Sequence, residues 1–340
     1  MTKYDANWAA EEAARRNWME KHGLYSSADE HASCGVGLVV SIDGTASRRV
    51  VENGIDALKA VWHRGAVDAD GKTGDGAGIH VQIPVAFFVE QIERTGHKRH
   101  GQEMIAVGQV FLPRTDFGAQ ETCRTIVETE VLRMGYYIYG WRHVPVNIEV
   151  LGEKANATRP EIEQILISNS KGVDEEQFER ELYVIRRRIE KAAAAAQVHG
   201  LYIASLSCRS IIYKGMMLAE QVAEFYPDLK DERFESAFAI YHQRYSTNTF
   251  PQWWLAQPFR MLAHNGEINT LKGNVNWMKS HEIRMASQSF GEMAEDIKPI
   301  IPQGSSDSAA LDAVFEVLVR AGRYGQMAKN NMGHETGFKQ

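Results

Sequence analysis

Apolar residues recur with helical spacing in several stretches of the chain. The clearest is 174–199, where they follow one another at intervals of four, three and four residues from Phe178 to Ile189. This spacing places them on one face of a helix. A second stretch, 6–22, is rich in alanine and charge and ends at Gly23, which is typical of a charged surface helix. Further helices are predicted over residues 49–62, 119–134 and 308–320.

Runs of small and β-branched residues between these helices predict strands. At 34–42 the chain changes abruptly from polar residues to a buried-strand pattern that ends at the turn Asp43-Gly44. Further strands are expected at 79–84, 104–112, 136–151 as a strand or hairpin, 201–213 as paired strands, and 236–243. Because strands and helices occur in clusters and do not alternate regularly, the pattern favours an α+β fold.

Composition and charge narrow the class of protein. The 340 residues are 44% hydrophobic and 24% charged, which is typical of a globular chain, and length alone predicts about two domains. The net charge of -6 argues against nucleic-acid binding, which requires a basic face. Apolar runs stay short of the roughly 18 residues that suggest a membrane span. We therefore expect neither nucleic acid nor membrane as a partner.

The N-terminal segment and the cysteines point to a reducing compartment. Charged residues between Glu11 and Glu20 stand where a secretory signal would carry its apolar region, so we expect a cytoplasmic protein. The three cysteines, Cys34, Cys123 and Cys208, include no CxxC pair and fit neither a disulfide framework nor a zinc site. An important cysteine in this chain would therefore be single and reduced.

Cys34 lies at the boundary between a polar leader and a buried strand. One interpretation is a small core residue, as for most cysteines. The other is a nucleophile exposed by removal of residues 1–33. Its own α-amino group could then act as the base, because an α-amine titrates at about 7.7–8.0, far below a lysine. N-terminal threonine nucleophiles use the same arrangement.

A loop rich in glycine, aspartate and basic residues runs from Trp62 to Gly78. It lacks the glutamate that closes an EF-hand and the upstream glycine of a P-loop. A plain surface loop and a metal-dependent hydrolase site built on Asp68, Asp70 and Asp75 are the alternatives. Glycines at this density allow backbone to approach another group closely.

Two later segments carry candidate binding groups. Arg244 follows the strand at 236–243 and could hold a carboxylate through two parallel hydrogen bonds, or form only a surface ion pair. Asn265-Gly266 could form a type I′ turn or supply an oxyanion hole from one side chain and one N–H group. Asp307 lies in Gly304–Ser308, which could cap the following helix or bind a substrate ammonium group.

Taken in order, these segments resemble the class II glutamine amidotransferases. The match is closer to the amidotransferase domain of the glutamate synthases and covers roughly residues 25 to 323. The matching motifs are Cys34-Gly-Val-Gly, the run 57–78, His242-Gln-Arg-Tyr-Ser-Thr-Asn-Thr249, His264-Asn-Gly-Glu-Ile-Asn-Thr270 and Gly304-Ser-Ser-Asp-Ser308.

This resemblance implies a fold and a reaction. The fold would be the four-layer α/β/β/α sandwich of N-terminal-nucleophile hydrolases, with two mainly antiparallel sheets. The domains would be a leader over 1–33, one amidotransferase domain over 34–321, and an unstructured tail over 322–340. The reaction would be hydrolysis of L-glutamine to glutamate and ammonia through a glutamyl thioester on a cysteine.

The resemblance also implies a role for each candidate residue. Cys34 would be the nucleophile, and Asn265 with the Gly266 N–H group would stabilise the oxyanion. The substrate carboxylate and ammonium groups would be held by Arg244 and Asp307. Thr247 would orient the glutamine, and Arg64 and Gly65 would position the new N-terminal amine.

The chain departs from this family in its length. Glutamate synthases continue into a synthase region that binds FMN and an iron–sulfur cluster and uses the ammonia to aminate 2-oxoglutarate. We expect no cofactor in this chain, whose scattered cysteines include no iron–sulfur motif. The partners would be that synthase domain and a small electron-transfer subunit. The glutaminase half-reaction is the expected activity, and an inactive unprocessed or truncated remnant that at most binds a partner is the alternative.

Overall fold

The computed structural model describes residues 6–23, 26, 35–246, 249–285, 288–326 and 328. The chain divides into two units, Met1–Cys34 and Gly35–Gln340, which are described separately. The first contains the helix α1 (Ala6–His22), which confirms the helix predicted there. The second contains two β-sheets and their flanking helices.

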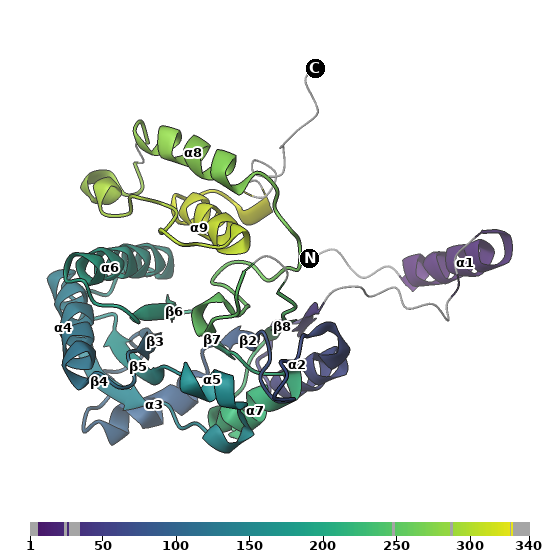
Figure 1. Ribbon diagram of the computed structural model, residues 1–340, viewed down its shortest axis with the longest axis horizontal. Helices are drawn as coiled ribbons and strands as arrows, with labels where there is room; N and C mark the ends of the chain where they lie inside the picture. The colour runs from purple at the N-terminus through teal and green to yellow at the C-terminus, as the bar shows by residue number, and fades with distance from the viewer. Residues whose placement is uncertain are drawn as a thin grey trace. The chain divides into compact units, whose positions relative to one another are not determined.

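Each of the two sheets has four antiparallel strands (Figure 1). The first has the order β1 (Val36–Val40), β8 (Phe238–Gln243), β2 (Ala77–Gln82), β7 (Ser210–Gly215). The second has the order β4 (Tyr137–His143), β5 (Glu161–Ser168), β3 (Ile105–Leu112), β6 (Tyr202–Ser207). The α+β class and the two antiparallel sheets between helices are confirmed.

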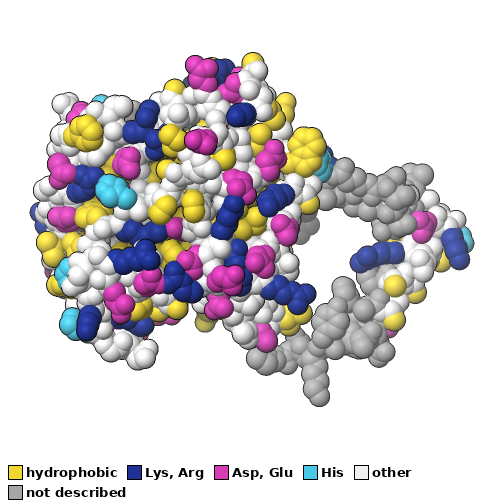
Figure 2. All heavy atoms as spheres, turned by 90° about the horizontal axis from the view of Figure 1, so that it is seen from below, with side chains coloured by type: hydrophobic (Ala, Val, Ile, Leu, Met, Phe, Trp, Pro, Cys, Tyr) yellow, Lys and Arg dark blue, Asp and Glu magenta, His cyan; other side chains and the backbone are white. Residues whose placement is uncertain are grey.

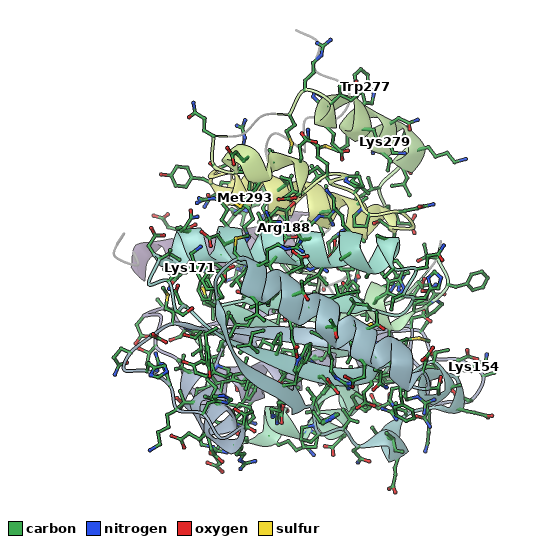
Figure 3. The ribbon with its side chains drawn as sticks, turned by 90° about the vertical axis from the view of Figure 1, so that its left-hand side faces the viewer. Lys154, Lys171, Arg188, Trp277, Lys279 and Met293 are labelled. Atoms are coloured by element: carbon green, nitrogen blue, oxygen red, sulfur yellow. The ribbon has the colours of Figure 1, made fainter. Side chains whose placement is uncertain are left out.

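Helices bury one face of each sheet. Figure 3 shows α4 (Phe117–Arg133) and α6 (Glu175–Ala195) side by side over the second sheet. Outward residues of β3 such as Val110 pack beneath these helices, whereas Phe111 belongs to the core shared with the first sheet. Every residue of β3 is therefore buried, and apart from Gln109 its sequence is apolar instead of alternating.

The remaining helices complete the fold. The first sheet packs against α2 (Arg48–Ala60). A third apolar cluster joins α9 (Asp307–Arg320) to α6 through Val317 and Tyr183, and Figure 1 shows α8 (Leu271–Glu282) beyond α9. The other helices are α3 (Val85–Arg94), α5 (Glu153–Ala157) and α7 (Val222–Phe225).

Several predicted elements differ from the structure. The segment 136–151 holds the single strand β4 followed by the 3₁₀ turn Ile148–Val150, so the hairpin alternative is wrong. The partner of β4 is β5, which the pattern missed because buried Glu163 and Gln164 interrupt its apolar residues. Of the tail 322–340, residues 322–326 and 328 are described, and the buried Ala328 donates its N–H to the Tyr324 carbonyl at 2.9 Å.

A buried polar network ties the two sheets together. Arg142 on β4 donates to both carboxylate oxygens of Asp228, at 2.7 and 2.6 Å. Tyr213 on β7 donates to Asp228 at 2.9 Å and accepts from Gln164 on β5 at 2.9 Å. Because every member has a partner, the network specifies how the sheets face each other.

The surface carries both signs of charge. On the face in Figure 2, Lys and Arg side chains intermingle with Asp and Glu and do not form a single basic field. Within the described part of the chain, helices are too short or too polar to cross a bilayer.

Gly54 allows α2 to approach the first sheet closely. A Cβ atom at Gly54 would lie 2.5 Å from the Ala239 Cβ, so Gly54→Ala should destabilise the fold by about 1–3 kcal/mol through overpacking. Alanine is the better helix former by roughly 1 kcal/mol, which opposes this cost. Denaturant unfolding measures the difference. In the control Gly118→Ala, where an added Cβ would lie at an ordinary contact distance of 3.5 Å from the Asp116 Oδ1, stability should rise by roughly 0.5–1 kcal/mol. Equal effects at both positions would contradict the close approach.

His80 should make stability depend on pH. Burial lowers the pKa of this histidine, which hydrogen bonds Ser210 at 2.7 Å, from 6.5 to about 4. Between these values the unfolded chain binds more protons, so stability falls as pH falls from 6.5 towards 4. Urea titrations measure the free energy of unfolding at each pH. In His80→Gln, the decrease in this free energy between pH 7 and pH 5 should be smaller than in the parent chain by roughly 2 kcal/mol. The exposed His199→Gln is the control, and an equal pH response in both variants would refute the assignment.

Candidate active site

The chain enters the first sheet beside the end of β8. The Gln243 N–H donates to the Gly35 carbonyl at 2.6 Å, and Val36 pairs with His242. A Cβ atom at Gly35 would lie 2.4 Å from the Gln243 carbonyl oxygen and 3.3 Å from the Arg64 Cβ. The predicted nucleophile, Cys34, lies outside the described residues. Gly35, which follows it in the sequence, packs beside Arg64 and accepts a hydrogen bond from Gln243, the residue before Arg244.

Arg244 is a buried cation, with 8% of its surface exposed. Its Nη1 donates to the Leu255 carbonyl at 3.2 Å, and its Nη2 donates to the hydroxyls of Thr249 at 2.6 Å and Ser246 at 3.2 Å. Burial lowers the arginine pKa, and the negative charges of Asp75 and Asp307 oppose that shift. The guanidinium therefore lies in a polar pocket built from the segment that follows it.

Asp75 lies close to this arginine. It accepts a hydrogen bond from the Ser246 N–H at 2.7 Å. Burial raises the pKa of its carboxyl group, while this bond and the Arg244 charge act in the opposite direction. The glycine-rich loop thus places the Asp75 carboxylate near the Arg244 guanidinium.

The other carboxylates of the loop have structural partners. Asp68 accepts from the Lys154 ammonium at 2.7 Å, and Asp70 accepts from the Thr73 N–H at 2.7 Å. Among the described residues, the structure contains no group of three His, Cys, Asp or Glu side chains placed to hold a metal ion. The loop geometry therefore does not favour the metal-dependent hydrolase.

Arg64 and Gly65 end the 3₁₀ turn Trp62–Arg64 beside β8. A Cβ atom at Gly65 would fall 2.0 Å from the Gln243 Nε2, so only glycine allows the loop to pack on this buried side chain. The structure thus brings Gly65, Arg64 and Gly35 together at one end of the sheet. Thr247 lies outside the described residues.

Asn265 and Gly266 lie on an exposed loop after His264. The Gly266 N–H donates to the His264 Nδ1 at 3.1 Å. Burial lowers the pKa of His264, which favours the neutral ring that can accept this bond. The predicted oxyanion donor, the Gly266 N–H, is therefore hydrogen bonded in this structure to the imidazole of His264.

The backbone of His264 is held by side chains from two other elements. Gln257 donates to the His264 carbonyl at 2.9 Å and accepts from the His264 N–H at 3.0 Å. His242 Nε2 lies 3.1 Å from the same carbonyl, and burial lowers the pKa of His242 to about 4. A neutral His242 with its proton on Nε2 donates this bond.

Asp307 begins α9, where Ser306 caps the helix by accepting from the Ala309 N–H. Its carboxylate accepts from the Ile268 N–H at 2.9 Å and from the Ser308 N–H at 2.8 Å. Its charge also acts on the pKa values of Arg244 and His264. Asp307 therefore joins the arginine and the Asn265 loop, although 39 residues of sequence separate it from its partner Ile268 in that loop.

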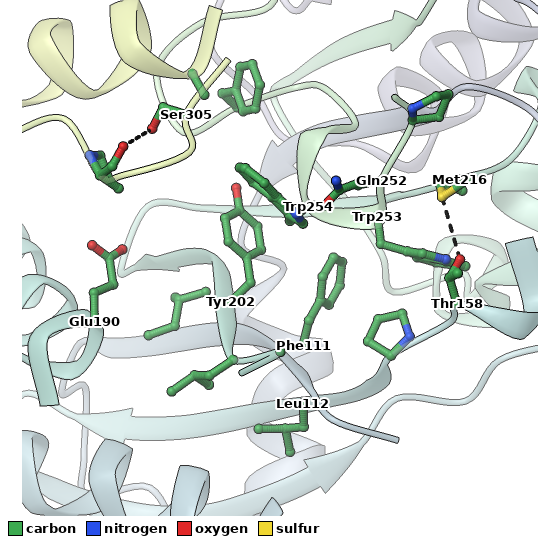
Figure 4. A pocket seen from close by; sticks show the side chains of 18 of the residues that line it. Phe111, Leu112, Thr158, Glu190, Tyr202, Met216, Gln252, Trp253, Trp254 and Ser305 are labelled. Carbon is green, nitrogen blue, oxygen red and sulfur yellow. Dashed lines mark hydrogen bonds between the residues drawn. The ribbon is translucent and has the colours of Figure 1, made fainter. Parts of the chain in front are cut away.

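A cavity of about 1010 Å³ opens beside this cluster and shares Asp75 with it. Figure 4 shows Phe111, Tyr202 and Trp254 along one side, and Glu190 and Ser305 on the opposite side. The cavity wall is aromatic with several charged side chains, whereas Arg244, His264 and Asp307 lie outside its lining.

Sequence reasoning missed several residues that build the cluster. Ser246 and Thr249 stand within a predicted motif but received no individual role, and Asp75 was predicted only as a candidate metal ligand. Gln257 stands outside them, and a single glutamine before a proline carries no chemical signal. Its position between the tryptophan pair and His264 was the only available indication.

Comparison with known proteins identifies a family and several relatives of this chain. The family model for class II glutamine amidotransferases matches residues 34–333. The glutamate synthase [NADPH] large chain of Azospirillum brasilense is 68% identical over 305 residues, which cover 90% of this chain and 20% of that protein. The corresponding large chain of Bacillus subtilis is 43% identical over 313 residues, covering 90% of this chain and 20% of the relative.

A third relative has the same coverage pattern. The chloroplastic ferredoxin-dependent glutamate synthase of Spinacia oleracea is 42% identical over 295 residues, covering 86% of this chain and 18% of its own length. This chain thus spans about a fifth of the length of the relatives it matches. It belongs to the class II glutamine amidotransferases.

Proposed function

We propose that this chain is the glutaminase domain of a glutamate synthase and hydrolyses L-glutamine with Cys34 as its nucleophile. The observation that supports this most is the convergence of Arg244, Asp307 and the Asn265-Gly266 loop beside the residue that follows Cys34. These groups match the three charges of the reaction: a carboxylate, an ammonium group and a developing oxyanion.

The first step makes a thioester. Removal of residues 1–33 frees the α-amino group of Cys34, which takes the thiol proton. The thiolate attacks the side-chain amide carbon of glutamine, and the oxyanion is stabilised by the Asn265 side chain and the Gly266 N–H. That N–H exchanges its bond to His264 for a bond to the oxyanion. The protonated amine then returns its proton to the leaving nitrogen, so that ammonia departs as the C–N bond breaks.

Hydrolysis completes the cycle. Water attacks the thioester carbon, the C–S bond breaks, and glutamate leaves with the thiol restored. Arg64 and Gly65 position the N-terminal amine, and Thr247 orients the glutamine.

Substrate binding depends on the two buried charges. Partners among the described residues take up three of the five N–H groups of Arg244, and the α-carboxylate of glutamine accepts from the other two. Asp307 receives the α-ammonium group. A pair of opposite charges in fixed positions recognises an α-amino acid and rejects a simple amide.

The ammonia would serve a synthase region in the whole enzyme, where it aminates 2-oxoglutarate in the cytoplasm. FMN and an iron–sulfur cluster belong to that region, which would be served by a small electron-transfer subunit. The described part of this chain holds no cysteine cluster that fits an iron–sulfur group: Cys123 is buried in the core and Cys208 is half-buried beside Glu179. The role proposed for this chain is therefore the supply of ammonia.

Cys34→Ala should abolish glutamine hydrolysis, because no other thiol is placed to replace it. Ammonia release from purified protein measures the effect, and circular dichroism checks the fold. The matched control is Cys208→Ala, which should keep its activity, since burial and Glu179 raise the pKa of the Cys208 thiol and suppress its thiolate. Hydrolysis that persists in Cys34→Ala would favour a different nucleophile, and an inactive parent chain would favour the remnant.

Arg244→Lys should weaken glutamine binding, since an ammonium group cannot reproduce the planar guanidinium contacts. Hydrogen bonds to charged groups contribute about 1.5–3 kcal/mol, so KM should rise roughly 10- to 100-fold. Steady-state kinetics gives KM, and thermal melting reports any loss of fold. Arg233→Lys, a surface ion pair with Asp231, is the control. An unchanged KM in Arg244→Lys would rule out the carboxylate role.

A further inference from the structure

We infer that Gln257 is a positioning residue for this reaction: its side-chain amide fixes the His264 peptide and thereby sets the place of the oxyanion donors Asn265 and Gly266. The inference rests on the proposed glutaminase function. It concerns a residue that lies outside the motifs of the resemblance and has no role in the chemistry itself.

The contact is a two-point clamp. Gln257 Nε2 donates to the His264 carbonyl at 2.9 Å, and the His264 N–H donates to the Gln257 Oε1 at 3.0 Å. Both bonds end on one residue, so they restrain its translation and its rotation together. Gln257 is 5% exposed, and a buried amide with both ends paired has one favourable orientation.

The clamp is continuous with the catalytic loop. Asn265 follows His264 by one peptide bond, and the Gly266 N–H is held by the His264 imidazole at 3.1 Å. His242 lies 3.1 Å from the carbonyl that Gln257 also contacts. A displaced His264 would therefore move both predicted oxyanion donors.

Gln257 is itself fixed to the rest of the fold from upstream. The preceding turn, Trp253–Leu255, presents the Trp254 carbonyl to the Lys214 ammonium at 3.1 Å and the Leu255 carbonyl to Arg244 at 3.2 Å. Leu255, whose carbonyl accepts from the carboxylate-binding Arg244, thus lies two residues before Gln257 on one short segment.

The segment is fixed from downstream as well. Asp312 on α9 is 1% exposed, and one of its carboxylate oxygens accepts from the Met261 and Leu262 N–H groups at 2.8 and 2.9 Å. With both ends anchored, Gln257 sets the distance between the group that binds the substrate carboxylate and the groups that stabilise the transition state.

This geometry predicts a loss in turnover with little loss in binding. Arg244 and Asp307 would hold the ground state, and among the described residues neither forms a hydrogen bond with Gln257. Oxyanion donors act mainly in the transition state, so their displacement lowers kcat. A misplacement of about 1 Å can cost about 10²-fold in rate.

The test replaces the amide by a side chain of similar length. Gln257→Met should lower kcat about 10²-fold with an unchanged KM for glutamine. Gln257→Glu keeps the acceptor for the His264 N–H but loses the donor, and should also lose kcat. The control is Gln120→Met on α4, a glutamine with the same 5% exposure whose amide also donates to a backbone carbonyl. It should keep its kcat.

Two further measurements separate positioning from general damage. Amide hydrogen exchange at Asn265 and Gly266 should be faster in Gln257→Met than in Gln120→Met. Alkylation of Cys34 by iodoacetamide, which requires no oxyanion hole, should proceed at the parent rate. A kcat loss no larger than that of Gln120→Met, or a loss confined to KM, would overturn the inference. If the parent chain hydrolyses no glutamine, the proposed function fails, and unchanged exchange rates would then overturn the clamp separately.

Discussion

The burial of the Arg244 guanidinium is the constraint around which this site is built. A cation that is 8% exposed requires polar partners, because desolvation without them is costly. The partners come from the residues that follow it, including Ser246, Thr249 and the Leu255 carbonyl, and from the charge of Asp75. The chain after β8 therefore folds back around its own arginine, and this return brings the Asn265 loop to the same end of the sheet.

Side-chain bonds to backbone hold the loops that carry the candidate chemistry. The Asn265 loop receives Gln257 from upstream and Asp307 from α9, and α9 also supplies Asp312 to the segment between them. Reactive groups on loops are well placed when a rigid scaffold supports them. Here the scaffold is the pair of sheets joined by the Arg142–Asp228 network, together with α9 packed on α6.

Sequence patterns predicted the elements whose burial follows a simple period. The helix expected over 174–199 corresponds to α6, because its apolar face packs on one sheet. The strand β5 and the helix α8 were missed for opposite reasons: β5 buries Glu163 and Gln164, and α8 leaves Trp277 exposed. The two sheets between helices were expected only from the family resemblance. The clamp at Gln257 could not be predicted, since it depends on a contact that no periodicity encodes.

The account depends on a thioester formed at Cys34, and mass spectrometry of the acid-quenched reaction tests this directly. The purified chain is mixed with L-glutamine, quenched within the first turnovers and digested at low pH, which preserves thioesters. The account predicts a peptide that begins at Cys34 and carries one added glutamyl group, which neutral hydroxylamine removes. Ammonia release without that adduct, or an adduct on Cys123 or Cys208, would contradict it.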